Sequence, residues 1–130
     1  MLNLFDVDQN RSWASMNNDQ RELSSINNGG LVWSGSNVDS GAAVFTGGRR
    51  SGQLRMYAPS RFEPGSSVSH WDVDLSPDEL MEPFATETSD ACAPVLALKD
   101  MGWNTMNECL PLFLQDTIIA PIINLLLDDE

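Results

Sequence analysis

Apolar residues in this chain occur in short groups separated by Gly, Ser and Asn, so the sequence predicts little regular secondary structure. Residues 1–15 show no repeating pattern and are expected to form a loop. Residues 34–53 contain five glycines, which favours a second loop with one small strand at residues 43–45. Residues 60–89 contain three prolines and few periodic features, so they are expected to form coil and turns.

Only a few segments carry the signals of regular elements. Residues 17–27 are expected to form a short helix, because Asn17 or Asn18 can cap it and because Leu23 and Ile26 are spaced for one face.

A second helix is expected at residues 92–102, and short strands at residues 31–33 and 54–57. Three apolar residues of that helix lie near one face: Val95, Leu98 and Met101. Gly102 is a natural C-cap, and Trp103 after it is expected to pack back on the helix.

The C-terminal segment at residues 105–130 is distinct from the region before it, at residues 1–104. It is strongly apolar, but prolines and polar residues interrupt it, whereas a membrane span needs about 20 mostly apolar residues. No transmembrane span is therefore expected. The segment is expected to pack on this domain or on another one.

The length of 130 residues corresponds to one domain or part of one, and its charge is unevenly distributed. Residues 1–65 hold six acidic residues and six arginines, whereas residues 66–130 hold thirteen acidic residues and one lysine, Lys99. The net charge of −12 disfavours a nucleic-acid partner, because no run of cations is present to replace phosphate counterions. It is compatible with calcium binding or with a role in solubility.

Two cysteines, Cys92 and Cys109, are separated by 16 residues. A disulfide between them would stabilise the folded state by roughly 3 kcal/mol. Two free buried thiols are the alternative. No CxxC spacing is present, which argues against a zinc ribbon or a redox motif.

The lone histidine, His70, lies within one of several sequence motifs that are spread along the chain and form a pattern. The longest stretches in this pattern are Gly30-Leu31-Val32-Trp33-Ser34-Gly35-Ser36-Asn37-Val38, Gly65-Ser66-Ser67-Val68-Ser69-His70-Trp71-Asp72, Asp78-Glu79-Leu80-Met81-Glu82-Pro83 and Leu96-Ala97-Leu98-Lys99-Asp100-Met101-Gly102-Trp103. Together they resemble the C-terminal, Met-turn part of a bacterial zinc metallopeptidase family related to leishmanolysin-type metzincins. The resemblance covers roughly residues 5–104.

The resemblance implies a role for two residues. His70 would be the third zinc ligand, and Met81 would be the buried Met-turn residue beneath the metal without coordinating it. The resemblance implies an α+β fold like a metzincin lower subdomain, mostly ordered coil with two short helices and a few short strands. It also implies a peptide or protein substrate and a secreted or cell-surface location as part of a longer precursor, since the chain begins without a signal peptide.

The chain lacks the rest of such a site, because no HExxH occurs in it. Catalytic zinc takes three protein ligands and one open position, which a single imidazole does not supply. The chain is therefore expected to carry no catalytic residue and to be inactive alone.

Two alternatives belong to other classes of protein. One is a non-catalytic exported binding domain, and the other is an acidic module stabilised by calcium at the run Asp72-x-Asp74-x-Ser76-x-Asp78. A similar start at Asp6 lacks the glycine and glutamate of an EF-hand, so an EF-hand is rejected there. Without the other half of a peptidase domain, exposed apolar surface and oligomerisation are also expected.

Overall fold

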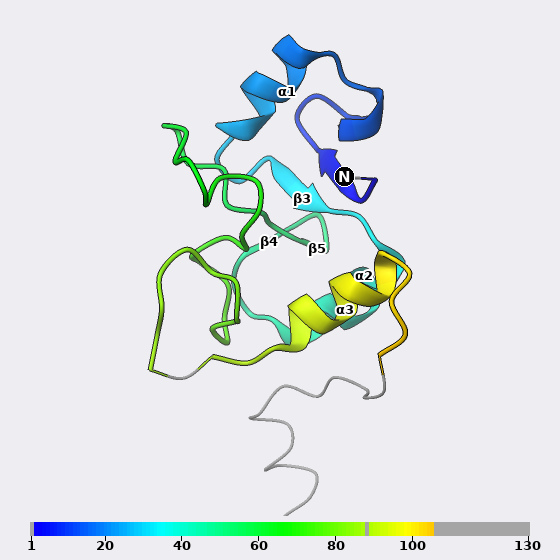
Figure 1. Cartoon of the computed structure of the whole chain (residues 1–130), viewed down its shortest axis with the longest axis vertical. Helices are drawn as coiled ribbons and strands as arrows, with labels where there is room; N and C mark the ends of the chain where they lie inside the picture. Colours follow the sequence, from blue (N-terminus) through cyan, green and yellow to red (C-terminus); the bar gives the residue numbers. More distant parts are fainter. Residues whose placement is uncertain (1, 88, 106–130) are drawn as a thin grey trace, which may run out of the picture.

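The computed structural model describes residues 2–87 and 89–105. Figure 1 shows helix α1 at one end of the molecule, short strands in the middle, and helices α2 and α3 packed beside each other below them. Long coil, made of residues 55–87 and 89–91, forms the remaining side of the molecule. This arrangement confirms a small α+β fold made largely of ordered coil.

A three-stranded antiparallel sheet in the order β2-β1-β3 forms the centre. Strand β1 spans Leu4–Asp6, β2 spans Arg11–Ser12 and β3 spans Leu31–Trp33, and a 3-10 helix follows β2 at Trp13–Ser15. The strand expected at residues 31–33 is confirmed, but the loop expected at residues 1–15 is wrong. Strands of two or three residues are too short to show a period. Their hydrogen bonds come from pairing within the sheet, where β1 pairs with β2 on one side and with β3 on the other.

Helix α1 spans Asn18–Ser25 and confirms the first expected helix. Asn17 caps it, and a reciprocal capping box links Asn17 with Gln20. The expected apolar face is wrong, because Leu23 is 64% exposed and the helix buries Ser24 instead.

A polar cluster explains why a serine faces inward. In this Asp6 cluster, the buried carboxylate of Asp6 accepts hydrogen bonds from Ser24 Oγ at 2.5 Å and from Asn27 Nδ2 at 3.1 Å. Backbone N–H groups of Asp8 and Gln9 also donate to it. Asp6 thus fixes both the β1–β2 turn and the end of α1.

Trp13 extends the cluster into the core. Its Nε1 donates to Ser24 Oγ at 2.8 Å, so the ring is buried while its polar atom is satisfied.

Helix α2 at Ser36–Gly41 and the 3-10 helix η2 at Ala42–Val44 were not expected. The strand predicted at residues 43–45 is therefore wrong. Local propensity is poor here, because Ser, Asp, Asn and Gly favour turns over helix interiors. Helix α2 forms because it packs against α3 and buries Val38, and Ala42 is buried at the start of η2 directly after it.

Beyond β3 the sheet continues through isolated bridges. Strands β4 (Arg49–Arg50) and β5 (Gln53–Leu54) form a small hairpin, and single bridges join Val32 to Arg55 and Met56 to Trp71. The strand predicted at residues 54–57 is thus only partly formed. No helix or multi-residue strand occurs among the described residues of 60–89, as expected.

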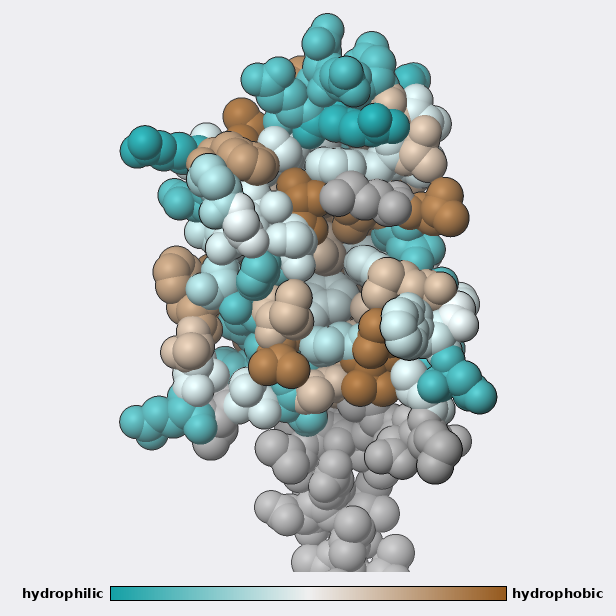
Figure 2. Space-filling view, viewed as in Figure 1, coloured by the Kyte–Doolittle hydropathy of each residue, from teal (hydrophilic) through white to brown (hydrophobic). Residues whose placement is uncertain are grey.

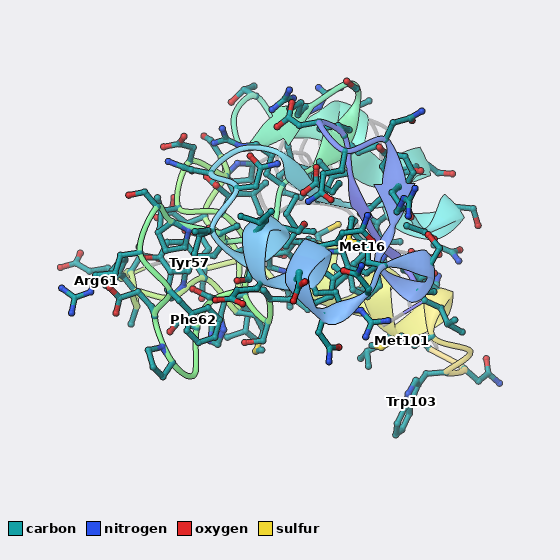
Figure 3. The ribbon with its side chains drawn as sticks, turned by 90° about the horizontal axis from the view of Figure 1, so that it is seen from above. Met16, Tyr57, Arg61, Phe62, Met101 and Trp103 are labelled. Carbon is teal, nitrogen blue, oxygen red and sulfur yellow. The ribbon has the colours of Figure 1, made fainter. Side chains whose placement is uncertain are left out.

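Helix α3 spans Cys92–Asp100 and confirms the last expected helix. It ends in a Schellman motif, in which Gly102 has φ +92° and Trp103 N donates to Leu98 O at 3.0 Å. The ring of Trp103 does not pack back, since it is 68% exposed and projects away from the body in Figure 3.

The buried face of α3 also differs from the expected one. Ala93 and Ala97 are its most enclosed residues besides Cys92, and Leu96 packs beside them. Small residues allow α3 to approach α2 closely, as at Gly41, where an added Cβ would lie 2.4 Å from Leu96 Cδ1.

One apolar core joins the sheet to the α2–α3 layer, with Leu31, Val32, Val38, Phe45 and Leu54 at most 1% exposed. The surface carries both hydrophilic and apolar regions. Figure 2 shows hydrophilic residues gathered at the α1 end and separate apolar patches lower on the same face. Exposed apolar side chains were expected and include Leu2, Phe62, Phe84 and Trp103, each at least half exposed.

Candidate functional site

The segment that carries His70 is held at the edge of the extended sheet. Tyr57 N donates to His70 O at 2.8 Å, and Val68 N donates to Tyr57 O at 2.7 Å. Asp72 N donates to Arg55 O at 3.1 Å. Residues 68–72 therefore lie beside residues 55–57 as an irregular ladder that fixes the backbone of His70.

The imidazole of His70 is half-buried and is oriented by its Nδ1 atom. Nδ1 lies 3.2 Å from Ser66 O and 3.0 Å from Ser69 Oγ. Ser69 Oγ is also within donating range of the carbonyls of Gly65 and Ser66. Since a carbonyl only accepts, a hydrogen bond to Ser66 O requires the proton on Nδ1, whereas the Ser69 contact is compatible with either tautomer. With the proton on Nδ1, the lone pair lies on Nε2, for which the described residues offer no hydrogen bond.

A turn at residues 78–82 packs against this segment. Trp71 N donates to Met81 O at 2.9 Å, so Met81 lies next to the residue that follows His70. Met81 has φ +73°, a conformation that non-glycine residues rarely adopt. The expectation that Met81 is buried is wrong, because its side chain is 48% exposed.

Met81 instead forms one wall of an apolar groove of about 690 Å³. The lining includes Trp33 and Trp71, whose ring centroids lie 5.8 Å apart. The remaining lining residues come from the N-terminus, the coil and α3: Leu2, Asn3, Leu4, Met56, Val68, Ser69, Pro94, Ala97, Leu98, Asp100 and Met101. His70 does not line the groove, although its neighbours on both sides do.

The last residue of α3, Asp100, joins two of the sequence motifs. Its carboxylate accepts hydrogen bonds from Trp33 Nε1 and from the backbone N and side-chain Nδ2 of Asn37, all at 2.8 Å. Val38 N donates at 3.2 Å. Asp100 therefore caps the N-terminus of α2 from a distant part of the chain. Gly35 is required beside it, because an added Cβ would lie 1.9 Å from Asp100 Oδ2.

Two opposing effects set the pKa of Asp100. Burial alone would raise it, but hydrogen bonds from Asn37, Trp33 and Val38 outweigh burial and hold the pKa below its usual value. Hydrogen bonds to the Asp100 carboxylate thus connect the sequence motif that contains Trp33 with the motif that contains Asp100.

Glu79, in the Met81 turn, is buried against the start of α3. Its Oε2 accepts a hydrogen bond from Ala93 N at 3.0 Å, while Oε1 is buried without a partner. Burial raises the pKa of Glu79 to about 8. Backbone hydrogen bonds from Ala93 and Cys92 oppose the rise, and the charges of Asp90 and Glu82 add to it.

The acidic run that starts at Asp72 is engaged with an arginine. Arg55 Nη2 binds Asp72 Oδ1 at 2.7 Å and also contacts Asp74 Oδ2. Two of the carboxylates proposed for calcium are therefore already paired, and the calcium hypothesis stays a prediction.

The donor set for zinc is incomplete in the described part of the chain. Residues 2–87 and 89–105 contain no group of three His, Cys, Asp or Glu side chains arranged to hold a metal. His70 has the right chemistry for one ligand, but these residues alone do not fit a zinc ion.

Cys92 is buried at the first position of α3. Its expected partner, Cys109, lies outside the described residues, so the disulfide stays a prediction. All of the apolar C-terminal segment except Thr105 also lies outside them. Within the described ranges, no helix has both the length and the apolar character needed to cross a membrane.

Sequence reasoning missed the roles of Asp100 and Glu79. The sequence places Asp100 only within a motif and Glu79 only among possible oxygen ligands of a metal, whereas in the structure each caps a helix. A signal was present, since neither α2 nor α3 has a capping side chain just before it: Gly35 and Ala91 occupy those places. A helix without its own cap points to a cap from elsewhere in the chain.

Comparison with known proteins leaves the family undecided. No protein-family model, curated protein or solved structure matches the chain.

Proposed function

We propose that this chain is the C-terminal half of a secreted, metzincin-like zinc endopeptidase, in which His70 supplies the third zinc ligand. The observation that carries the proposal is the orientation of the imidazole. Nδ1 lies 3.2 Å from Ser66 O, and a proton on Nδ1 directed at this carbonyl leaves Nε2 available as a ligand. Metal-binding histidines commonly donate their other N–H to a carbonyl or carboxylate in this way.

The Met81 turn supports the same proposal. It is connected to the His70 segment by the Trp71–Met81 hydrogen bond, and it holds Met81 in a left-handed conformation. Such a conformation costs about 1–3 kcal/mol and persists only where the surroundings fix it, often at functional sites. The exposed groove beside the turn is where a missing half of the domain and its substrate would meet this chain.

On this proposal the chain is inactive by itself, because the other ligands and the general base come from outside it. A bound zinc would polarise the scissile carbonyl and activate water. The residues of this chain contribute by orienting His70 and by forming the wall at Met81.

The purified chain is expected to leave casein uncut, with or without zinc. Its His70 is expected to be the Nδ1–H tautomer near pH 8, measured by long-range ¹H–¹⁵N spectra. Added Zn²⁺ should perturb Nε2 before Nδ1. A protonated Nε2 would contradict the proposal, and so would casein cleavage by this chain alone that His70→Ala abolishes.

The decisive genetic observation is the coding sequence upstream of Met1. An in-frame HExxH there, with zinc-dependent casein cleavage by the extended protein that His70→Ala abolishes, would support the proposal. If the upstream sequence encodes no such motif, the proposal fails.

A second candidate is a non-catalytic binding domain, and the groove favours it. Among the described residues that line the groove, Asp100 alone is charged, and its oxygens already accept four hydrogen bonds. An occupant would therefore be an uncharged apolar polypeptide segment, packed against methionine and tryptophan side chains.

An uncharged Leu-rich helical peptide is expected to change the fluorescence of Trp33 and Trp71 on binding. Met81→Glu should weaken binding at least about tenfold, because it places a charge against the apolar segment. Leu80→Glu is the matched control, since Leu80 is 53% exposed next to Met81 but does not line the groove. Equal effects of the two variants would rule out the groove as the binding site, and a concentration-dependent mass without peptide would assign it to self-association.

A further inference from the structure

Glu79 links the Met81 turn to helix α3, which is otherwise uncapped. Ala91 at the N-cap position makes no side-chain cap, and no acidic residue lies in the first turn of α3. The carboxyl group of Glu79 fills this place from a different segment, by accepting the hydrogen bond of Ala93 N. The side chain is only 2% exposed.

The backbone completes the connection. Leu80 N donates to Asp90 O at 2.5 Å, and Asp90 N donates to Asp78 O at 2.9 Å. These two bonds form a short parallel bridge between the turn and the residues just before α3. Together with the Glu79–Ala93 hydrogen bond, they hold the turn against the start of α3.

The surroundings of Glu79 disfavour a negative charge. Its Oε1 is buried without a hydrogen-bond partner, which is costly for an ionised oxygen and less so for a neutral carboxyl group. The partial positive charge of the α3 N-terminus opposes this effect, but α3 has only nine residues.

The nearby charged groups are mostly acidic. They are Asp78 and Glu82 on the turn, Asp90 before α3, and Asp72 on the segment packed against the turn. Two cationic groups are also in this region. Arg55 is bound to Asp72 and Asp74, and Lys99 lies in the last turn of α3. His70, also on the packed segment, has its Nδ1 directed at Ser66 O.

We propose that Glu79 is a proton-dependent latch. The protonated side chain holds the Met81 turn against α3, and the turn opens more often as rising pH favours loss of this proton. When the turn opens, the carboxyl group reaches water and releases its proton to solvent. Because Met81 lines the groove, opening of the latch also opens one wall of the groove. The latch does not depend on metal binding by His70.

The sign of the pH dependence follows from the two states. The pKa is about 8 when the latch is closed and ordinary, near 4.5, when it is open. The stability of the closed latch is therefore fully present below pH 4.5 and is lost as pH rises toward 8. Between these values, each unit of pH favours opening by about tenfold.

Amide hydrogen exchange tests the latch residue by residue. After correction for intrinsic exchange, protection of the Leu80 and Asp90 amides is expected to fall about tenfold per unit between pH 5.5 and 7.5. Protection of Val7 and Met56, whose amides lie in the sheet, should stay constant. A parallel loss at all four amides would mean global unfolding and would overturn the latch.

Glu79→Gln keeps an oxygen for Ala93 N and removes the ionisation, so its protection should be independent of pH. Glu87→Gln removes the same charge from an exposed position and should retain the wild-type slope. A slope that persists in Glu79→Gln would overturn the proposal. If that variant does not fold, the wild-type ¹³C titration of the Glu79 carboxyl decides, since a pKa near 4.5 contradicts the latch.

Discussion

Replacing Asp6 by asparagine is expected to lower the free energy of unfolding by about 3–4 kcal/mol, because it breaks the hydrogen bonds of a fully buried carboxylate. The two oxygens of Asp6 accept hydrogen bonds from Ser24, Asn27 and the β1–β2 turn. In asparagine, one of these oxygens becomes an NH₂ group that faces other donors. For a domain of this size the melting temperature should fall by roughly 15–25 °C, measured by circular dichroism.

Asp8→Asn is the matched control for Asp6→Asn, since it makes the same chemical change in the same turn. The side chain of Asp8 is 45% exposed and forms an ion pair with Arg50. Exposed ion pairs contribute about 0–1 kcal/mol, so the control should melt within a few degrees of wild type. Similar losses in the two variants would show that burial of Asp6 does not matter.

Asp100→Asn is expected to destabilise the protein by about 2–3 kcal/mol, or roughly 10–15 °C in melting temperature. Asp100 is the N-terminal cap of α2, and all its partners are donors. An asparagine retains one accepting oxygen and turns its NH₂ group toward the remaining N–H groups. The α2–α3 layer should loosen first, which amide exchange at Asn37 and Val38 would detect.

Asp39→Asn is the control on the same helix. Asp39 lies on the exposed side of α2. Partial desolvation of its carboxyl group, together with the negative charge of Asp100, raises its pKa even though Gln53 donates a hydrogen bond to it. Removing its charge should change the melting temperature by less than about 3 °C. A loss as large as that of Asp100→Asn would mean that net charge, and not the cap, controls α2.

Wild-type protein and Asp100→Asn are also expected to differ in their response to acid. The folded pKa of Asp100 is lowered from 3.8, so its stabilisation is present above that value and is lost as pH falls through the folded pKa. Wild-type protein should therefore lose stability more steeply than Asp100→Asn on acidification below about pH 4.

Elements with local signals were predictable from the sequence. Asn17 and Gln20 mark the start of α1, and Gly102 marks the end of α3. These residues act on backbone groups within four positions of themselves, so the amino-acid order alone carries the information.

Elements that depend on distant partners were not predictable. Helix α2 has a sequence typical of a loop, and it exists because Asp100 and α3 complete it. In α1, Ser24 is buried because Asp6 requires its hydroxyl group, whereas the apolar Leu23 is left in solvent. A pattern of apolar spacing does not register a buried polar contact.

The role of His70 and Met81 as parts of one site stays a prediction, but the structure can be compared with their placement. The order of His70, Met81 and Gly102-Trp103 can be read from the sequence, and the structure joins the His70 segment to the Met81 turn. The exposure of Met81 and the unpaired oxygen of Glu79 depend on how the coil packs, which no local pattern determines.

The Asp100 cap has a consequence for the newly made chain. Its hydrogen bonds to Trp33, Asn37 and Val38 span 62 to 67 residues. At about 5–20 residues per second, several seconds of synthesis separate the start of α2 from its cap. During that time the first turn of α2 has no capping side chain. On the ribosome, the α1 end of the molecule can fold early, whereas the groove can close only after residue 100 has emerged.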